Sequence, residues 1–213
     1  MITVGANLGV RPWLFSNSRI KTWPQDFPAG QLMIIAAHVP IGVEVTAPNS
    51  EMGWWTDPQN AVTLPDLIAE LQSHPNLLAW LSGHRHLNTV KAFISPDPAG
   101  APEKGFWQVE TPSLRDFPQQ FRTFEIYLNS DYTISIVATD VDPAVQKGTP
   151  AAASRKYAIA ATQIVNTWDV TNKWNPTNDP TIKPMPTGSY NAELLKQLSP
   201  AMKEKMRTLY PTP

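Results

Sequence analysis

The sequence predicts a mixed α/β domain that leans toward the α+β class, and three observations favour this. Two apolar runs, at 31–37 and 77–82, lack the alternation of a half-exposed strand and indicate interior strands. A helical pattern lies between them, so these strands are expected to pair in parallel through a crossover. Alternating apolar residues at 124–128 and 132–138 then predict an antiparallel hairpin.

The remaining elements of the first 140 residues follow from local signals. A helix is expected to begin near Thr63-Leu64-Pro65-Asp66, which has the form of a capping box, and His74-Pro75 ends it. Strands are expected at 88–94 and 106–111. The order strand, helix, strand followed by further strands is typical of a mixed sheet.

Three helices are expected in the carboxyl-terminal part of the chain. The longest runs from about Ser154 to Trp168 and carries an apolar stripe. Two shorter helices are expected at 191–198 and 200–209. Ser199-Pro200 supplies the cap and the first-turn residue of the last one.

The 22 prolines lie mostly outside these periodic segments and indicate long, ordered loops. Residues 1–28 are expected to form an irregular amino-terminal segment, because prolines interrupt them. Residues 29–142 hold the predicted strands, and residues 143–213 form a Pro-rich, helical carboxyl-terminal extension.

The composition is typical of a soluble globular protein and argues against a nucleic-acid-binding protein and against a membrane-spanning one. The chain has 213 residues, of which 42% are hydrophobic, and its formal net charge of −1 gives no electrostatic case for nucleic-acid binding. No apolar stretch approaches the roughly 18 residues that a membrane helix needs, and no signal peptide is visible. Cysteine is absent, so any metal site must use histidine, carboxylate or amide ligands.

The most informative motif is Gly83-His84-Arg85-His86, which holds two of only four histidines. It follows one predicted interior strand, and His38 follows the other. Histidines that follow the carboxyl ends of neighbouring strands favour a metal site at that edge of the sheet. A packed or solvent-facing histidine pair is the alternative, and the strand context makes the metal site the better interpretation.

Other polar and aromatic residues carry weaker signals. His74 is predicted to have a structural role at the end of a helix. Trp54-Trp55 could line the entrance of a substrate site, although packing of these side chains that anchors their loop on the core is favoured. Four acidic residues are further candidate metal ligands that spacing alone does not select: Glu44, Asp57, Glu110 and Asp116.

These motifs resemble those of the calcineurin-like metallophosphoesterases. The resemblance lies in Ala37-His38-Val39-Pro40 after a hydrophobic strand, then a helix, then the stretch from Leu81 to His86. The stretch from Gly105 to Ser113 is similar to the strand that follows this motif in the family. The resemblance covers about residues 30–140. More specifically, the chain is similar to a bacterial subgroup of the family whose proteins have long inserts between the motifs and are often exported.

The resemblance implies a two-sheet αββα sandwich, of which this chain supplies the second half: a mixed sheet with carboxyl-terminal helices. It implies hydrolysis of phosphate esters with two divalent metal ions, whether manganese, iron or zinc. His38 and His84 would bind one ion and His86 the other. Arg85 could contact the phosphate of the substrate, although a solvent-facing salt bridge is favoured.

The first-half motifs of the family do not occur in this sequence. The chain has no Asp-x-His, no Gly-Asp and no Asn-His. Three neutral histidines supply no negative charge to offset the positive charge of two divalent ions. The chain is therefore expected to be an incomplete and inactive carboxyl half of the enzyme. A truncation, a frame change or a split gene would produce it. It is then expected to bind a complementary amino-terminal half or a second copy of itself. The resembling subgroup suggests a periplasmic or extracellular location.

Two other interpretations stay open. The chain could be a non-catalytic domain that kept half of the sandwich and binds a partner through its surface. It could also be an unrelated His-x-His barrel such as a cupin. The helix between the two histidine-bearing strands disfavours a cupin, as does the position of His38 before the pair.

Overall fold

The computed structural model describes residues 31–42, 64–117, 119–167 and 191–211, and the side chains of 162–167 are not described. Several sequence predictions fall outside these ranges: the segment 1–28, Glu44, Trp54-Trp55, Asp57, the capping residue Thr63 and Trp168.

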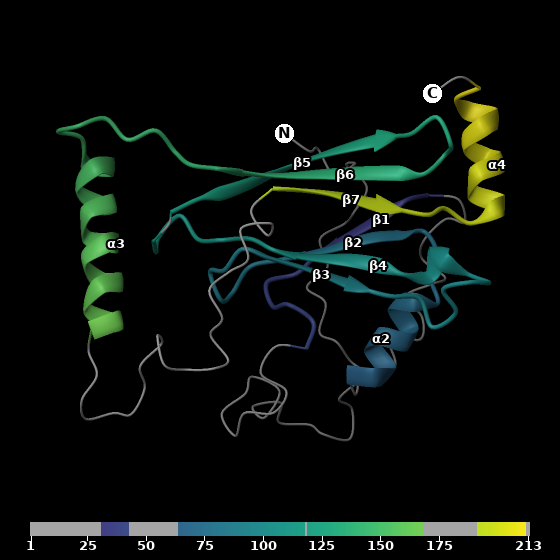
Figure 1. Ribbon diagram of the computed structural model, residues 1–213, viewed down its shortest axis with the longest axis horizontal. Helices are drawn as coiled ribbons and strands as arrows, with labels where there is room; N and C mark the ends of the chain where they lie inside the picture. The colour runs from purple at the N-terminus through teal and green to yellow at the C-terminus, as the bar shows by residue number, and fades with distance from the viewer. Residues whose placement is uncertain (1–30, 43–63, 118, 168–190, 212–213) are drawn as a thin grey trace.

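The described chain contains seven strands in two sheets and three α-helices. The strands are Met33–Ala36 (β1), Leu77–Ser82 (β2), Thr89–Phe93 (β3), Phe106–Glu110 (β4), Phe121–Leu128 (β5), Ile134–Val141 (β6) and Ala192–Lys196 (β7). The helices are Leu64–Gln72 (α2), Pro150–Thr167 (α3) and Pro200–Leu209 (α4), with a short 3₁₀ helix at Pro102–Lys104 (η3). The predicted mixed α/β architecture is confirmed (Figure 1).

The first sheet, sheet A, is ordered β1-β2-β4-β3. β1 and β2 pair in parallel, as do β2 and β4, whereas β3 runs antiparallel to β4. Helix α2 is therefore the predicted crossover between two parallel strands. Among the described residues, β1 and β3 are the outer strands of an open sheet, whereas a cupin has a closed barrel.

Both faces of sheet A are covered, α2 lying on one side and the second sheet on the other (Figure 1). One buried cluster joins sheet A to α2 and includes Leu71, Leu77 and Trp80. A second cluster lies between the two sheets and includes Leu78 and Ile136. Burial of each such large side chain contributes about 1.5–3 kcal/mol, which explains why the central strands are apolar along their length.

The second sheet, sheet B, has the order β5-β6-β7 and is antiparallel throughout. β5 and β6 form the predicted hairpin, in which Leu128 pairs with Ile134. The turn between them contains Asn129, whose side-chain amide donates to the Thr133 and Ser135 hydroxyls. The turn chemistry read from the sequence is therefore present in the structure.

Strand β7 contradicts the helix that the sequence predicts at 191–198. Residues such as Ala, Glu, Leu and Lys favour a helix, but this preference is worth less than about 1 kcal/mol per residue. Pairing with β6 satisfies the backbone of both strands, and Leu194 and Lys196 are buried while Glu193 and Leu195 are exposed. The carboxyl-terminal extension thus adds a strand to sheet B and is not wholly helical.

Strand β7 is tied to the start of β4 by polar contacts. The Trp107 indole N–H donates to the Leu195 carbonyl oxygen over 2.8 Å. The Lys196 ammonium, only 3% exposed, donates to the carbonyl oxygens of Glu103 and Gly105. Burial lowers the pKa of Lys196 to about 8, and the negative charge of Glu103 partly opposes this shift.

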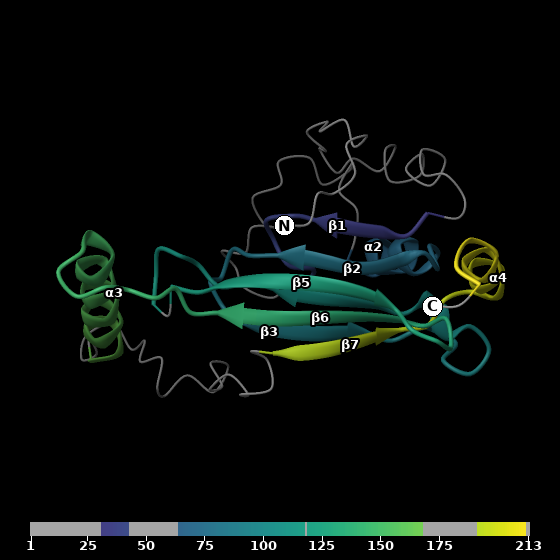
Figure 2. The same ribbon diagram turned by 90° about the horizontal axis from the view of Figure 1, so that it is seen from above.

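The two long carboxyl-terminal helices lie at opposite ends of the sheets (Figures 1 and 2). α4 has the predicted cap, because the Ser199 hydroxyl accepts from the Met202 N–H over 3.3 Å. α3 confirms the predicted helix and stands beyond the sheet ends, with Tyr157 on its predicted stripe 75% exposed. Of the helices in the described ranges, none has the length and apolar character that crossing a bilayer requires.

Candidate functional site

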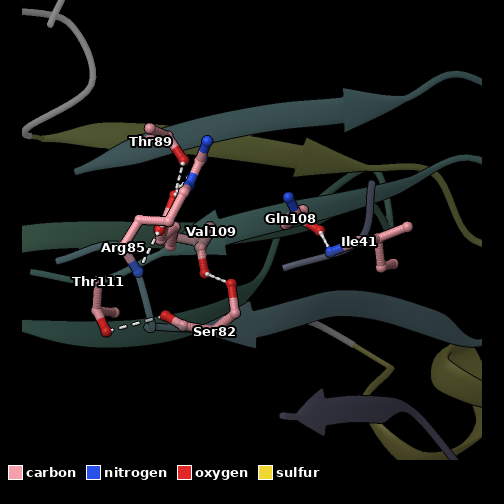
Figure 3. A network of polar contacts seen from close by, with 8 residues as sticks. Ile41, Ser82, Arg85, Thr89, Gln108, Val109 and Thr111 are labelled. Atoms are coloured by element: carbon pink, nitrogen blue, oxygen red, sulfur yellow. Dashed lines mark hydrogen bonds and ion pairs between the residues drawn. The ribbon is translucent and has the colours of Figure 1, made fainter. Parts of the chain in front are cut away.

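The candidate site lies where the parallel strands of sheet A end. Because β1, β2 and β4 run in parallel, their carboxyl ends meet at one edge of the sheet. His38 follows β1, Gly83 opens the turn after β2, and Thr111 follows β4. The Gly83 N–H donates to the His38 carbonyl oxygen over 3.0 Å. The Thr111 backbone N–H and hydroxyl both donate to the Ser82 carbonyl oxygen, at 2.7 and 3.0 Å, and join the ends of β2 and β4. Figure 3 shows the hydroxyl contact.

The imidazoles of His38 and His84 approach each other closely at this edge. His84 Nδ1 lies 3.3 Å from His38 Nε2. The centroids of the two rings are 5.1 Å apart, in a T-shaped arrangement. A tetrahedral metal ion with bonds of about 2.0–2.1 Å to nitrogen holds two such nitrogens about 3.3 Å apart. The spacing therefore fits two ligands of one ion. The same separation also satisfies the geometry of a direct hydrogen bond between the two imidazoles.

The third predicted ligand, His86, points to a different partner. Its Nδ1 pairs with a carboxylate oxygen of Asp116, and both side chains are partly exposed. In the described ranges, no group of three or more His, Cys, Asp or Glu side chains is arranged to hold a metal ion. The structure thus brings His38 and His84 together and gives His86 an acidic neighbour that sequence spacing had not singled out.

The backbone of the histidine turn adopts an uncommon conformation. His84 and His86 have φ angles of 78° and 59°, in the left-handed region that residues with a Cβ rarely occupy. The Arg85 N–H donates to the Gly83 carbonyl oxygen over 3.1 Å, which closes a γ-turn around His84. Such strain costs on the order of 1–3 kcal/mol per residue and persists only where surrounding contacts impose it.

Because of this strain, glycine at position 84 should destabilise the fold less than alanine does, although alanine is usually the less destabilising residue. Both His84→Gly and His84→Ala remove the imidazole, but glycine tolerates a φ of 78° and alanine does not. The glycine variant is expected to be more stable than the alanine variant by about 1 kcal/mol, measured as the free energy of unfolding in urea. Equal stabilities, or a more stable alanine variant, would contradict the strained turn.

Arg85 forms an ion pair with a fully buried carboxylate. Its Nη2 lies 2.6 Å from Glu110 Oε2, and its Nε lies 3.1 and 3.2 Å from the two carboxylate oxygens. Glu110 is completely buried, whereas the Arg85 side chain is 35% exposed. The sequence favours a solvent-facing salt bridge for Arg85; the salt bridge is present, but its carboxylate is buried. Spacing in the sequence indicates only a possible metal ligand at Glu110, although an acidic residue ending an apolar strand signals a paired buried charge.

An open hollow of about 360 Å³ lies beside His38. His38 itself lines it, together with residues at the ends of β1 and β2 and the first residue after β4. The lining residues are Ala36, Ala37, His38, Leu81, Ser82 and Thr111. It lies at the same sheet edge as the paired imidazoles and provides room for a ligand there.

The fourth histidine lies in a different environment. His74 Nε2 is 3.2 Å from Glu70 Oε1, an i,i+4 contact at the end of α2. This position agrees with the structural role that the sequence analysis assigned to His74, and it makes this residue a useful control in metal-binding experiments.

Comparisons with known proteins add no assignment to this geometry. No protein-family model matches the chain, and no curated protein matches it either.

Proposed function

We propose that this chain is the carboxyl-terminal half of a calcineurin-like metallophosphoesterase, a metal-dependent hydrolase of phosphate esters. The observation that carries the proposal is the 3.3 Å approach of His84 Nδ1 to His38 Nε2 at the ends of adjacent parallel strands. This is the pair that the resemblance assigns to one metal ion.

The layers of the fold support the proposal. Helix α2, sheet A and sheet B stack as three consecutive layers, the order that three of the four layers of an αββα sandwich would have. The site lies at the carboxyl ends of parallel strands, where open α/β sheets bind their ligands.

Each polar residue has a role in this proposal. Neutral imidazoles of His38 and His84 hold one ion, and His86 with Asp116 contributes ligands toward the second. When bound, the metal ions supply Lewis-acid activation of the phosphoryl group and lower the pKa of a water molecule. The Thr111 hydroxyl fixes the end of β2, and the hollow beside His38 accepts the substrate.

The site needs ligands from elsewhere. At the sheet edge the described residues offer one carboxylate outside the Arg85 ion pair, that of Asp116, against the four positive charges of two divalent ions. Bridging and terminal carboxylates are needed to hold both ions. A complementary polypeptide with the missing first-half motifs supplies them in this proposal.

The surface offers a place for such a partner. β1 and β5 are outer strands of their sheets, and Leu32, next to β1, lines an apolar hollow together with Ile126 of β5. The two outer strands therefore lie on the same side of the sandwich. Leu209 and Tyr210 beside this hollow are more than half exposed, so a partner that extends both sheets would cover apolar surface.

Reconstitution tests the proposal. With manganese or zinc and a chromogenic aryl phosphate, the purified chain is expected to show only background hydrolysis. Mixing with a polypeptide that carries Asp-x-His and Gly-Asn-His motifs is expected to raise hydrolysis at least 100-fold, and His84→Ala in the chain is expected to abolish that gain. Hydrolysis by the chain alone, or a reconstituted activity that His84→Ala leaves intact, would contradict the proposal.

A further inference from the structure

We propose that Glu110 is a positioning residue whose buried carboxylate holds the strained histidine turn in the conformation that aims His84 at His38. The metal-binding consequence of this inference rests on the proposed function, whereas the geometry does not depend on it.

Glu110 is the last residue of β4 and accepts hydrogen bonds from Arg85 in the histidine turn and from Thr89 just after it. Three donors come from Arg85: its backbone N–H at 3.2 Å, its Nε and its Nη2. The fourth is the Thr89 hydroxyl at 3.0 Å, on the first residue of β3. Figure 3 shows Arg85 and Thr89 close together, with dashed lines for their contacts. One carboxylate thus ties the middle of the turn to its exit.

The contact with the backbone of Arg85 explains how the strained conformation persists. The same N–H closes the γ-turn on the Gly83 carbonyl oxygen at 3.1 Å and reaches Glu110 Oε1 at 3.2 Å. This shared donor lies between His84 and His86, the two residues with positive φ. Without the carboxylate, the N–H would keep only the poorly aligned γ-turn bond, and the turn could relax to a less strained conformation.

An amide at position 110 cannot replace the carboxylate. Glutamine has one acceptor oxygen and an NH₂ group that faces the Arg85 donors, whereas the carboxylate has two acceptor oxygens and a negative charge for the guanidinium. Glu110→Gln therefore keeps the size of the side chain, removes its negative charge, and leaves one acceptor oxygen for donors that now use two. Lys196→Met is a matched control, because Lys196 is also a buried charge but bonds at the opposite, Gly105 end of β4.

The test uses the full chain without metal first. Imidazole ¹⁵N resonances of His84 and His86 are recorded at one fixed pH, together with hydrogen exchange of the Arg85 amide. Glu110→Gln is expected to shift both imidazole resonances and to accelerate Arg85 exchange at least tenfold, while Lys196→Met leaves both unchanged. Zinc affinity is expected to fall by 10–100-fold in Glu110→Gln only, the range seen when a residue that orients ligands is lost.

Unchanged imidazole resonances in Glu110→Gln, or equal shifts in Lys196→Met, would overturn the inference. If Glu110→Gln does not fold, Glu110→Asp gives the same test, because a carboxylate one methylene shorter is drawn away from the Arg85 backbone N–H and the Thr89 hydroxyl; it must shift the His84 and His86 resonances too. A wild-type chain that binds no zinc would refute the proposed function, and the resonances would still decide the role of Glu110.

Discussion

His84→Ala is expected to weaken zinc binding by the chain roughly 100-fold. The wild-type chain is expected to bind one zinc ion, weakly, because two neutral imidazoles at 3.3 Å form one edge of a tetrahedron while the other ligands are water. Removing one of two protein ligands ends the chelation, so the loss of affinity is expected at the top of the 10–100-fold range that outer-shell changes cause. Isothermal titration with zinc at pH 7.5 measures the effect.

His38→Ala must weaken binding to a similar extent, because the two nitrogens share the ion. His74→Ala is the matched control, since His74 contacts Glu70 at the end of α2 and should leave zinc affinity within twofold. A His84→Ala variant that binds zinc as tightly as the wild type would show that the ion lies elsewhere.

The stability contributed by Lys196 is expected to rise with pH between about 8 and 10.5. Burial lowers the pKa of Lys196 to about 8 in the folded protein, against an ordinary value of 10.5. Within this window the unfolded chain binds more protons than the folded one, so the free energy of unfolding increases with pH. Below the window both states are protonated, and the folded state carries the full cost of a buried charge. Deprotonation relieves up to about 3 kcal/mol across the window.

Urea unfolding of the wild type and of Lys196→Met at pH 7.5, 9 and 10.5 measures this contribution, because titration of all other groups cancels in the difference. The wild type is expected to gain stability relative to Lys196→Met as the pH rises. A difference that stays constant or falls with pH would contradict a buried, charged Lys196 in the folded protein.

Much of the fold was predictable because its central strands are apolar along their length. β2 matches the predicted segment 77–82, and α4 matches 200–209 together with its Ser199 cap. β7 was not predictable from local sequence, because its strand conformation comes from pairing with β6, 50 residues or more away in the sequence. Long-range pairing overrides helix preference at such positions.

The candidate site was predictable in part. The neighbouring positions of His38 and His84 follow from two parallel strands ending at one edge, which the strand-helix-strand pattern implies. The direction of His86 was not predictable, because it depends on two positive φ angles that the sequence does not signal. The role of Glu110 depends on side-chain geometry between β4 and the turn, and only the burial of a charge at the end of an apolar strand pointed to it.

The central claim is that one metal ion lies between His38 and His84. Crystals of the chain grown with zinc and measured on both sides of the zinc absorption edge test it directly. We expect an anomalous peak about 2.1 Å from both His84 Nδ1 and His38 Nε2. Two imidazoles joined by a direct hydrogen bond with no peak between them, at zinc concentrations that saturate the titration, would contradict it.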